Sequence, residues 1–120
     1  MNGAAVVAKI LKQEGVDVLI AYPVNPIIEA AAKENIRTLI VRQERPGLHM
    51  ADAIGRLTSG RKIGVFAWQW GPGAENAFAG VSTAFSDACG FFTYIHLANT
   101  QPTIAIPRDT PMKSTSIAAL

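Results

Sequence analysis

Short apolar runs alternate along this chain with longer segments whose apolar residues recur at helical spacing. The runs span residues 17–22, 37–41, 62–68 and 91–97, with 103–106 as a shorter candidate. Helices are predicted between an Asn2 N-cap and Gly15, over 27–34 after an Asn25 cap, over 47–58 and over about 74–88. Strands that alternate with helices favour right-handed crossovers and a mainly parallel sheet. The pattern therefore predicts a three-layer α/β/α fold.

The composition is typical of one globular domain. The 120 residues are 49% hydrophobic, and 11 basic and 9 acidic residues are spread along the chain. No charged block indicates a nucleic-acid or membrane partner. Cys89 is the only cysteine, which excludes an internal disulfide and favours a reducing compartment. Because Lys9, Lys12 and Glu14 interrupt the first apolar segment, no signal peptide or membrane span is expected, and we predict a cytoplasmic protein.

Three loops of the predicted sheet contain the residues with the most chemical interest. They follow the runs that end at Tyr22, Val41 and Trp68. Ligands of open α/β sheets bind beyond the carboxyl ends of the strands, so these loops are expected to converge at one edge. They contain residues 23–26, Glu44 and residues 69–73, with Asn76 one turn into the next helix.

Glu44 is the carboxylate in these loops, in a polar hinge over residues 42–46 that precedes a predicted helix. It could handle a proton, since a helix start favours its ionised form and burial opposes it. It could equally satisfy free N–H groups of the helix, and spacing alone favours that structural role. Likewise, Gly71-Pro72-Gly73 suits either a close backbone approach to a ligand or a tight turn. Trp68 could cover a bound ring or belong to the core, and the sequence shows no metal-ligand pair.

The chain resembles a known family over an ordered series of motifs. VRQERPGLHMADAIGRLTSG over residues 41–60 is followed by Gly64-Val65-Phe66 and by GPGAEN over residues 71–76. This series is similar to the pyrimidine-binding N-terminal domain of thiamine-diphosphate-dependent enzymes, especially the acetolactate synthase-like branch. The family pattern has Arg-x-Glu before a helix and, later, Gly-Pro-Gly-Ala-x-Asn. The likeness is traced over residues 3–89.

The resemblance implies a cofactor and a role for each matching residue. Thiamine diphosphate is the implied cofactor, and Glu44 would hydrogen-bond N1′ of its aminopyrimidine and so promote removal of the thiazolium C2 proton. The implied reactions are decarboxylation of 2-oxo acids and two-carbon transfer. By the same comparison, the residues lining the pyrimidine pocket would be Pro23, Val24, Gly71, Gly73 and Asn76.

Departures from the family pattern shape the remaining expectations. Val24 replaces a common glycine, and residues 53–55 replace Gly-Tyr-Ala. The Gly-Asp-Gly and Asn-Asn motifs that bind the diphosphate and Mg²⁺ in the family are absent from this sequence. We therefore expect Mg²⁺ to bind only through a diphosphate-binding domain on another chain or missing segment. The resemblance also implies a homodimer that forms through this domain.

The final residues lose the alternating pattern and become rich in Thr, Ser and Pro. We predict a partial pyrimidine-binding domain over residues 1–97, truncated at its C-terminus, and a divergent, poorly ordered tail over 98–120. This tail motivates an alternative function, a non-catalytic fragment or interaction subunit without cofactor turnover.

Overall fold

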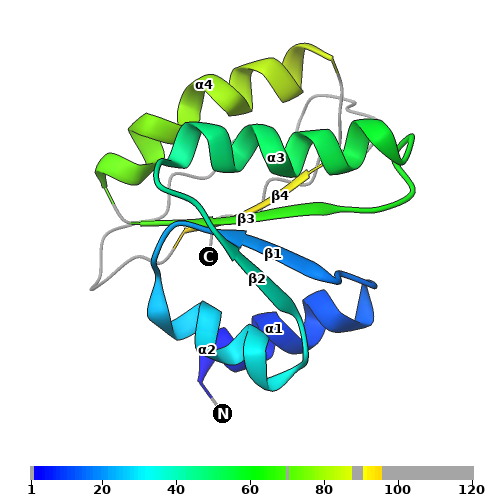
Figure 1. Cartoon of the computed structure of the whole chain (residues 1–120), viewed down its shortest axis with the longest axis vertical. Coiled ribbons are helices and arrows are strands. Elements are labelled where there is room, and N and C mark those ends of the chain that lie inside the picture. The colour runs from blue at the N-terminus through cyan, green and yellow to red at the C-terminus, as the bar shows by residue number, and fades with distance from the viewer. Residues whose placement is uncertain (1, 70, 88–90, 96–120) are drawn as a thin grey trace, which may run out of the picture.

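The computed structural model describes residues 2–69, 71–87 and 91–95 as a three-layer α/β structure. In chain order its elements are α1 (Gly3–Gln13), β1 (Val18–Ala21), α2 (Asn25–Lys33), β2 (Arg37–Ile40), α3 (Glu44–Leu57), β3 (Gly64–Trp68), α4 (Pro72–Ser86) and β4 (Phe91–Ile95). The parallel sheet has the order β2-β1-β3-β4. Helices α1 and α2 cover one face, and α3 and α4 cover the other (Figure 1). The predicted fold class is confirmed.

The carboxyl ends of three strands lie level with one another. Ala21 of β1 is in register with Ile40 of β2 and with Ala67 of β3. Beyond the strands, the Tyr22 N–H donates to the Ala67 carbonyl and the Val41 N–H donates to the Ala21 carbonyl, both at 2.9 Å. The three loops that follow these strands therefore leave from the same edge of the sheet, as predicted.

Strands β1 and β3 are apolar throughout because helices cover both of their faces. On one face, Leu19, Ala21, Val65 and Ala67 pack with α1 and α2. On the other, Ile20, Phe66 and Trp68 pack with α3 and α4. Strand β2 is different, since it lies at the edge and Ile40 is 52% exposed. Full coverage thus belongs to the central strands of the sheet.

Two glycines allow α3 to lie directly on β3. A Cβ atom added at Gly47 would lie 2.6 Å from Phe66 Cζ, and one added at Gly64 would meet the backbone of Ala51. Both contacts are closer than packed atoms tolerate. The absence of side chains at these positions therefore fixes the height of α3 above the sheet.

The helix boundaries confirm some predictions and correct others. Asn2 caps α1 by accepting a hydrogen bond from the Ala5 N–H at 2.9 Å, and Gly15 beyond its end has a φ of 77°. The N-cap of α2 is Val24 rather than Asn25. Helix α3 begins at Glu44, three residues before the predicted start, because Pro46 is tolerated in a first helical turn. Glu44 is consequently a helical residue and not part of a hinge.

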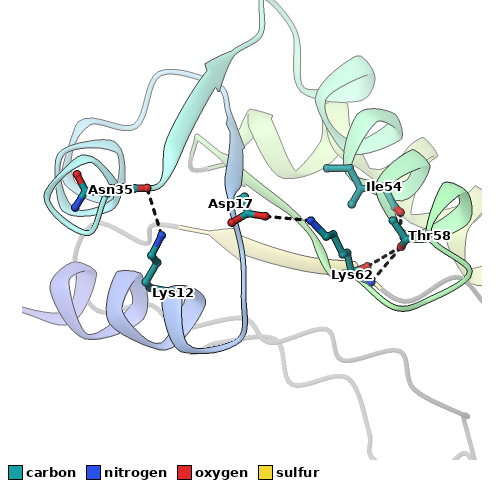
Figure 2. Close-up of polar contacts among 6 residues, drawn as sticks. All are labelled: Lys12, Asp17, Asn35, Ile54, Thr58 and Lys62. Atoms are coloured by element: carbon teal, nitrogen blue, oxygen red, sulfur yellow. Dashed lines mark hydrogen bonds and ion pairs between the residues drawn. The ribbon is translucent and has the colours of Figure 1, made fainter.

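Polar contacts link the elements at the amino ends of the strands (Figure 2). Lys62 Nζ lies 3.1 Å from Asp17 Oδ2, and Lys12 Nζ donates to the Asn35 carbonyl at 3.5 Å. Thr58 Oγ1 donates to the Ile54 carbonyl and accepts from the Lys62 N–H. Each exposed pair of this kind contributes at most about 1 kcal/mol. These contacts connect the sheet edge opposite to the one from which the three loops leave.

None of the helices in the described ranges has the length and apolar character needed to cross a membrane.

Candidate functional site

Glu44 is a buried acid at the carboxyl edge of the sheet. It occupies the first turn of α3, just after β2, and is 6% exposed. Asn76, one turn into α4, donates a hydrogen bond from Nδ2 to Glu44 Oε2 at 3.2 Å. Burying a carboxylate is unfavourable unless it has a partner, and Asn76 supplies one. The structure thus brings together two residues that are 32 positions apart in the sequence.

The contacts of Glu44 do not support the capping role that spacing alone favours. Among the described residues, the hydrogen bond accepted by its carboxylate comes from the Asn76 amide and not from a free N–H of α3. Its second oxygen, Oε1, accepts none from those residues. Within the described part of the chain, Oε1 is thus an acceptor that a ligand could use.

Gly73 borders this free oxygen. A Cβ atom at Gly73 would lie 3.2 Å from Glu44 Oε1 and 3.2 Å from Trp68 Cδ1. A side chain at this position would crowd the carboxylate, so glycine lets the start of α4 lie close to Glu44. A buried carboxylate that an amide holds by one oxygen can pair through the other with a ring nitrogen, so the chemistry of Glu44 and Asn76 fits an aminopyrimidine.

Gly71 forms the turn into α4. It is the N-cap residue with a φ of 57°, a conformation that favours glycine, and its carbonyl accepts a hydrogen bond from the Ala74 N–H at 3.0 Å. In the Gly71-Pro72-Gly73 motif, Gly71 thus forms the turn, and Gly73 lets α4 lie close to Glu44 and Trp68.

Pro23 and Val24 follow β1 at the same edge of the sheet. Neither forms a hydrogen bond with Glu44. The Val24 side chain is buried in the core beneath α1 and α2, and its carbonyl accepts from the Ile28 N–H at 3.3 Å. Pro23 is exposed. The next residues, Asn25 and Pro26, help line a hollow of about 460 Å³ between α1 and α2. Of the six predicted site residues, the structure groups Glu44, Gly73 and Asn76 most closely.

Trp68 belongs to the core. It is buried with its ring centroid 5.7 Å from that of Phe66, and its indole nitrogen has no hydrogen-bond partner among the residues that the structure describes. The core interpretation of this residue is therefore supported over a ring-covering role. Within the described ranges, no three His, Cys, Asp or Glu side chains are grouped closely enough to hold a metal ion.

Sequence reasoning missed the residues that hold α3 and α4 together. Arg56 Nη1 lies 2.7 Å from Asp87 Oδ2, and Arg56 Nε lies 2.6 Å from Asp52 Oδ2. Leu48 of α3 lies directly beneath Gly80 of α4. The four-residue spacing of Asp52 and Arg56 was the available signal for the ion pair. The contact between the helices had no signal in the sequence.

Comparison with known proteins identifies the family. The sequence model of one protein family, described as the thiamine pyrophosphate enzyme N-terminal TPP binding domain, matches residues 1–117. The chain belongs to this family. The match includes residues beyond 89, where the motif comparison ended. As a TPP binding domain, the chain carries the buried glutamate, the Gly-Pro-Gly turn and the asparagine that the family pattern contains.

Curated relatives of this TPP binding domain include large subunits of acetolactate synthase. The chain is 38% identical over 95 residues to the acetolactate synthase large subunit of Parasynechococcus marenigrum. It is 37% identical over 91 residues to a probable acetolactate synthase large subunit of Methanococcus aeolicus. It is 33% identical over 92 residues to the isozyme 3 large subunit of Escherichia coli. Each alignment covers 73% of this chain but only 15–16% of the relative.

Proposed function

We propose that this TPP binding domain supplies the aminopyrimidine half of a thiamine diphosphate site in a cytoplasmic, acetolactate synthase-like enzyme that acts on 2-oxo acids. The observation that carries the proposal is the buried Glu44 carboxylate. Asn76 holds one of its oxygens at 3.2 Å, and the other oxygen lies beside Gly73, where a side chain would crowd it. A carboxylate that is desolvated but still has a free acceptor suits proton exchange with a ring nitrogen.

Each residue of the site has a distinct part in this proposal. Glu44 accepts from, or donates to, N1′ of the aminopyrimidine, and Asn76 fixes the plane of its carboxylate. Gly73 keeps a side chain away from the carboxylate and offers backbone surface to the ring. Pro23, Val24 and Gly71 form the surrounding loops and offer mainly backbone surface. The cofactor, when bound, supplies the electron sink for cleaving and forming carbon–carbon bonds.

The other half of the site is proposed to come from a diphosphate-binding domain outside this sequence. The chain spans about 15% of the length of the curated relatives described above. The part of the chain that the structure describes offers no group of metal-ligating side chains. We therefore propose that Mg²⁺ and the diphosphate are held by that second domain.

Thermal unfolding with thiamine diphosphate and Mg²⁺ tests this division of the site. The chain alone is expected to show no change in midpoint. Mixed with the remainder of an acetolactate synthase large subunit as a separate polypeptide, it should be stabilised by about 2.7 kcal/mol at a cofactor concentration 100 times the dissociation constant. Isothermal titration calorimetry would measure that constant directly.

Two results would contradict the proposal. Tight binding by the chain alone would show that the site does not need a second half. A stable complex with the second polypeptide whose unfolding midpoint does not change with cofactor would instead favour the alternative, an interaction subunit without cofactor turnover. Glu44→Ala, which removes the acceptor, should abolish cofactor binding in the complex if the proposed site is used.

We also propose that two copies of the chain pair through this domain. Phe78 and Phe85 are 69% and 57% exposed and lie seven residues apart on α4. Seven residues are close to two helical turns, so the two rings share a face. That face differs from the one that packs on α3, which carries Gly73, Ala77, Gly80 and Ala84. Burial of two phenylalanines per copy favours self-association.

Light scattering after size-exclusion chromatography should accordingly give twice the mass of one chain, and Phe78→Glu should give the monomer mass. Ile10→Glu is the matched control, because Ile10 is a half-exposed apolar residue of α1 on the other side of the sheet. A monomeric parent chain, or equal dissociation by both variants, would contradict pairing through α4.

A further inference from the structure

Helices α3 and α4 run in the same direction (Figure 1), and Leu48 of α3 packs against Gly80 of α4. A Cβ atom at Gly80 would lie 2.8 Å from Leu48 Cδ2 and 3.0 Å from Leu48 Cβ. A Cβ at this position would require Leu48 or α4 itself to move. Since the distance between packed helices depends on the side chains at their contact, Gly80 sets how closely α4 approaches α3.

This contact lies one helical turn from the candidate site. Leu48 follows Glu44 by four residues, and Gly80 follows Asn76 by four residues. Residues four apart lie one above the other on the same side of a helix. The Leu48–Gly80 contact and the Glu44–Asn76 hydrogen bond are therefore successive steps along a single interface.

The hydrogen bond tolerates little displacement of α4. The distance from Asn76 Nδ2 to Glu44 Oε2 is 3.2 Å, the upper end of the usual range for such a bond. A helix turn is rigid, so a shift at Gly80 of about 1 Å would carry Asn76 out of hydrogen-bonding distance. At the far end the helices are tied by Arg56 and Asp87, whose side chains are 36% and 53% exposed. A partly exposed ion pair resists such a shift only weakly.

We propose that Gly80 is a positioning residue, which acts with Leu48 to set the distance between Asn76 and Glu44. The effect of Gly80 on catalysis rests on the proposed function, in which Glu44 exchanges a proton with the cofactor and Asn76 holds Glu44. Gly80 acts through Asn76. Its contribution is the absence of a side chain, which brings the amide onto the carboxylate and leaves Oε1 free.

The side-chain amide resonance of Asn76 reports on this distance in the free chain. Its amide protons can be assigned by their loss in Asn76→Asp, and Glu44→Ala defines their position without the acceptor. In Gly80→Ala, the resonance is expected to move more than half of the way to the position seen in Glu44→Ala. An unchanged resonance in a folded Gly80→Ala chain would overturn the proposal.

Ile27→Val is the matched control for loss of stability. Ile27 is fully buried, but its contacts lie in the core beneath α1 and α2. At a temperature where the two variants are equally folded, Ile27→Val should leave the Asn76 resonance in place. An equal movement in both variants would show that the resonance follows stability and would overturn the proposal.

A second variant covers the case in which Gly80→Ala does not fold. Leu48→Ala removes Cγ and Cδ2, two of the three atoms nearest the added Cβ. The double variant Gly80→Ala, Leu48→Ala should fold and return the resonance toward that of the parent chain, and failure to do so would overturn the proposal. None of these spectra requires cofactor. If these spectra are as expected but the complex with the second polypeptide binds no thiamine diphosphate, the proposed function alone would be refuted.

Discussion

Replacement of Glu44 by Gln is expected to reduce turnover by about 10²–10⁴-fold in a complex with a diphosphate-binding domain. Gln has the shape of Glu, and its amide oxygen still accepts the hydrogen bond that Asn76 donates at 3.2 Å. The amide cannot exchange a proton with a ring nitrogen. The rate of product formation from a 2-oxo acid, measured at saturating cofactor, tests this expectation.

The control for this substitution is Glu29→Gln. Glu29 is an exposed residue of α2, which lies on the other side of the sheet from Glu44. The Glu29→Gln substitution removes the same charge and should leave turnover within twofold of the parent complex. Glu44→Gln should also keep the unfolding midpoint of the free chain, because no packing atom is lost. Full turnover in Glu44→Gln would exclude a proton-handling role for this residue.

The substitution Gly64→Ala is expected to destabilise the chain by at least about 4 kcal/mol, which is exceptional for one methyl group. An added Cβ would lie 2.5 Å from the carbonyl carbon of Ala51 and 2.9 Å from its Cα. These are backbone atoms of α3, and they cannot rotate away as a side chain can. Relief requires α3 to lift from β3, which would open the core around Phe66. Urea unfolding followed by circular dichroism measures the loss.

Gly3→Ala provides the comparison for this effect. Gly3 is the first residue of α1, and nothing lies within 4 Å of a Cβ added there. Alanine favours a helix over glycine by up to about 1 kcal/mol, so this variant should be as stable as the parent chain or slightly more stable. A common urea midpoint for Gly64→Ala and the parent chain would show that α3 does not rest on β3 as described.

The order of helices and strands was predictable from the sequence because each element has its own local signal. Strands β1 and β3 are short apolar runs, and the limits of α1 are marked by Asn2 and Gly15. The start of α3 was predicted three residues late. Pro46 and the charged residues before it suggest a hinge, but a first helical turn accepts both proline and an acidic side chain.

The exposure of β2 was not predictable from its composition. Its sequence, Arg37-Thr38-Leu39-Ile40, has the β-branched and apolar residues of a well-covered strand. Its place at the sheet edge depends on which strands pair, a property that arises only when distant parts of the chain meet. The candidate strand at 103–106 and the predicted tail lie outside the described residues, and the domain boundary at 97 stays a prediction.

The candidate site was predictable in part. Topology alone places the loops that contain Glu44 and Gly73 at one edge, and the structure confirms that these residues meet. The hydrogen bond from Asn76 and the support from Leu48 and Gly80 depend on the height of one helix above another. That height results from side-chain volumes across an interface, which periodicity does not encode.

The strand order has a consequence for the way the chain is synthesised. Strand β1 lies between β2 and β3, so one of its two neighbours begins only at Gly64. At roughly 5–20 residues per second, a ribosome needs about 2–9 s to reach that residue after completing β1. During this interval the backbone N–H and C=O groups on one side of β1 have no strand to pair with. A nascent chain that stalls before Trp68 presents a bare, apolar strand edge on which other chains can assemble.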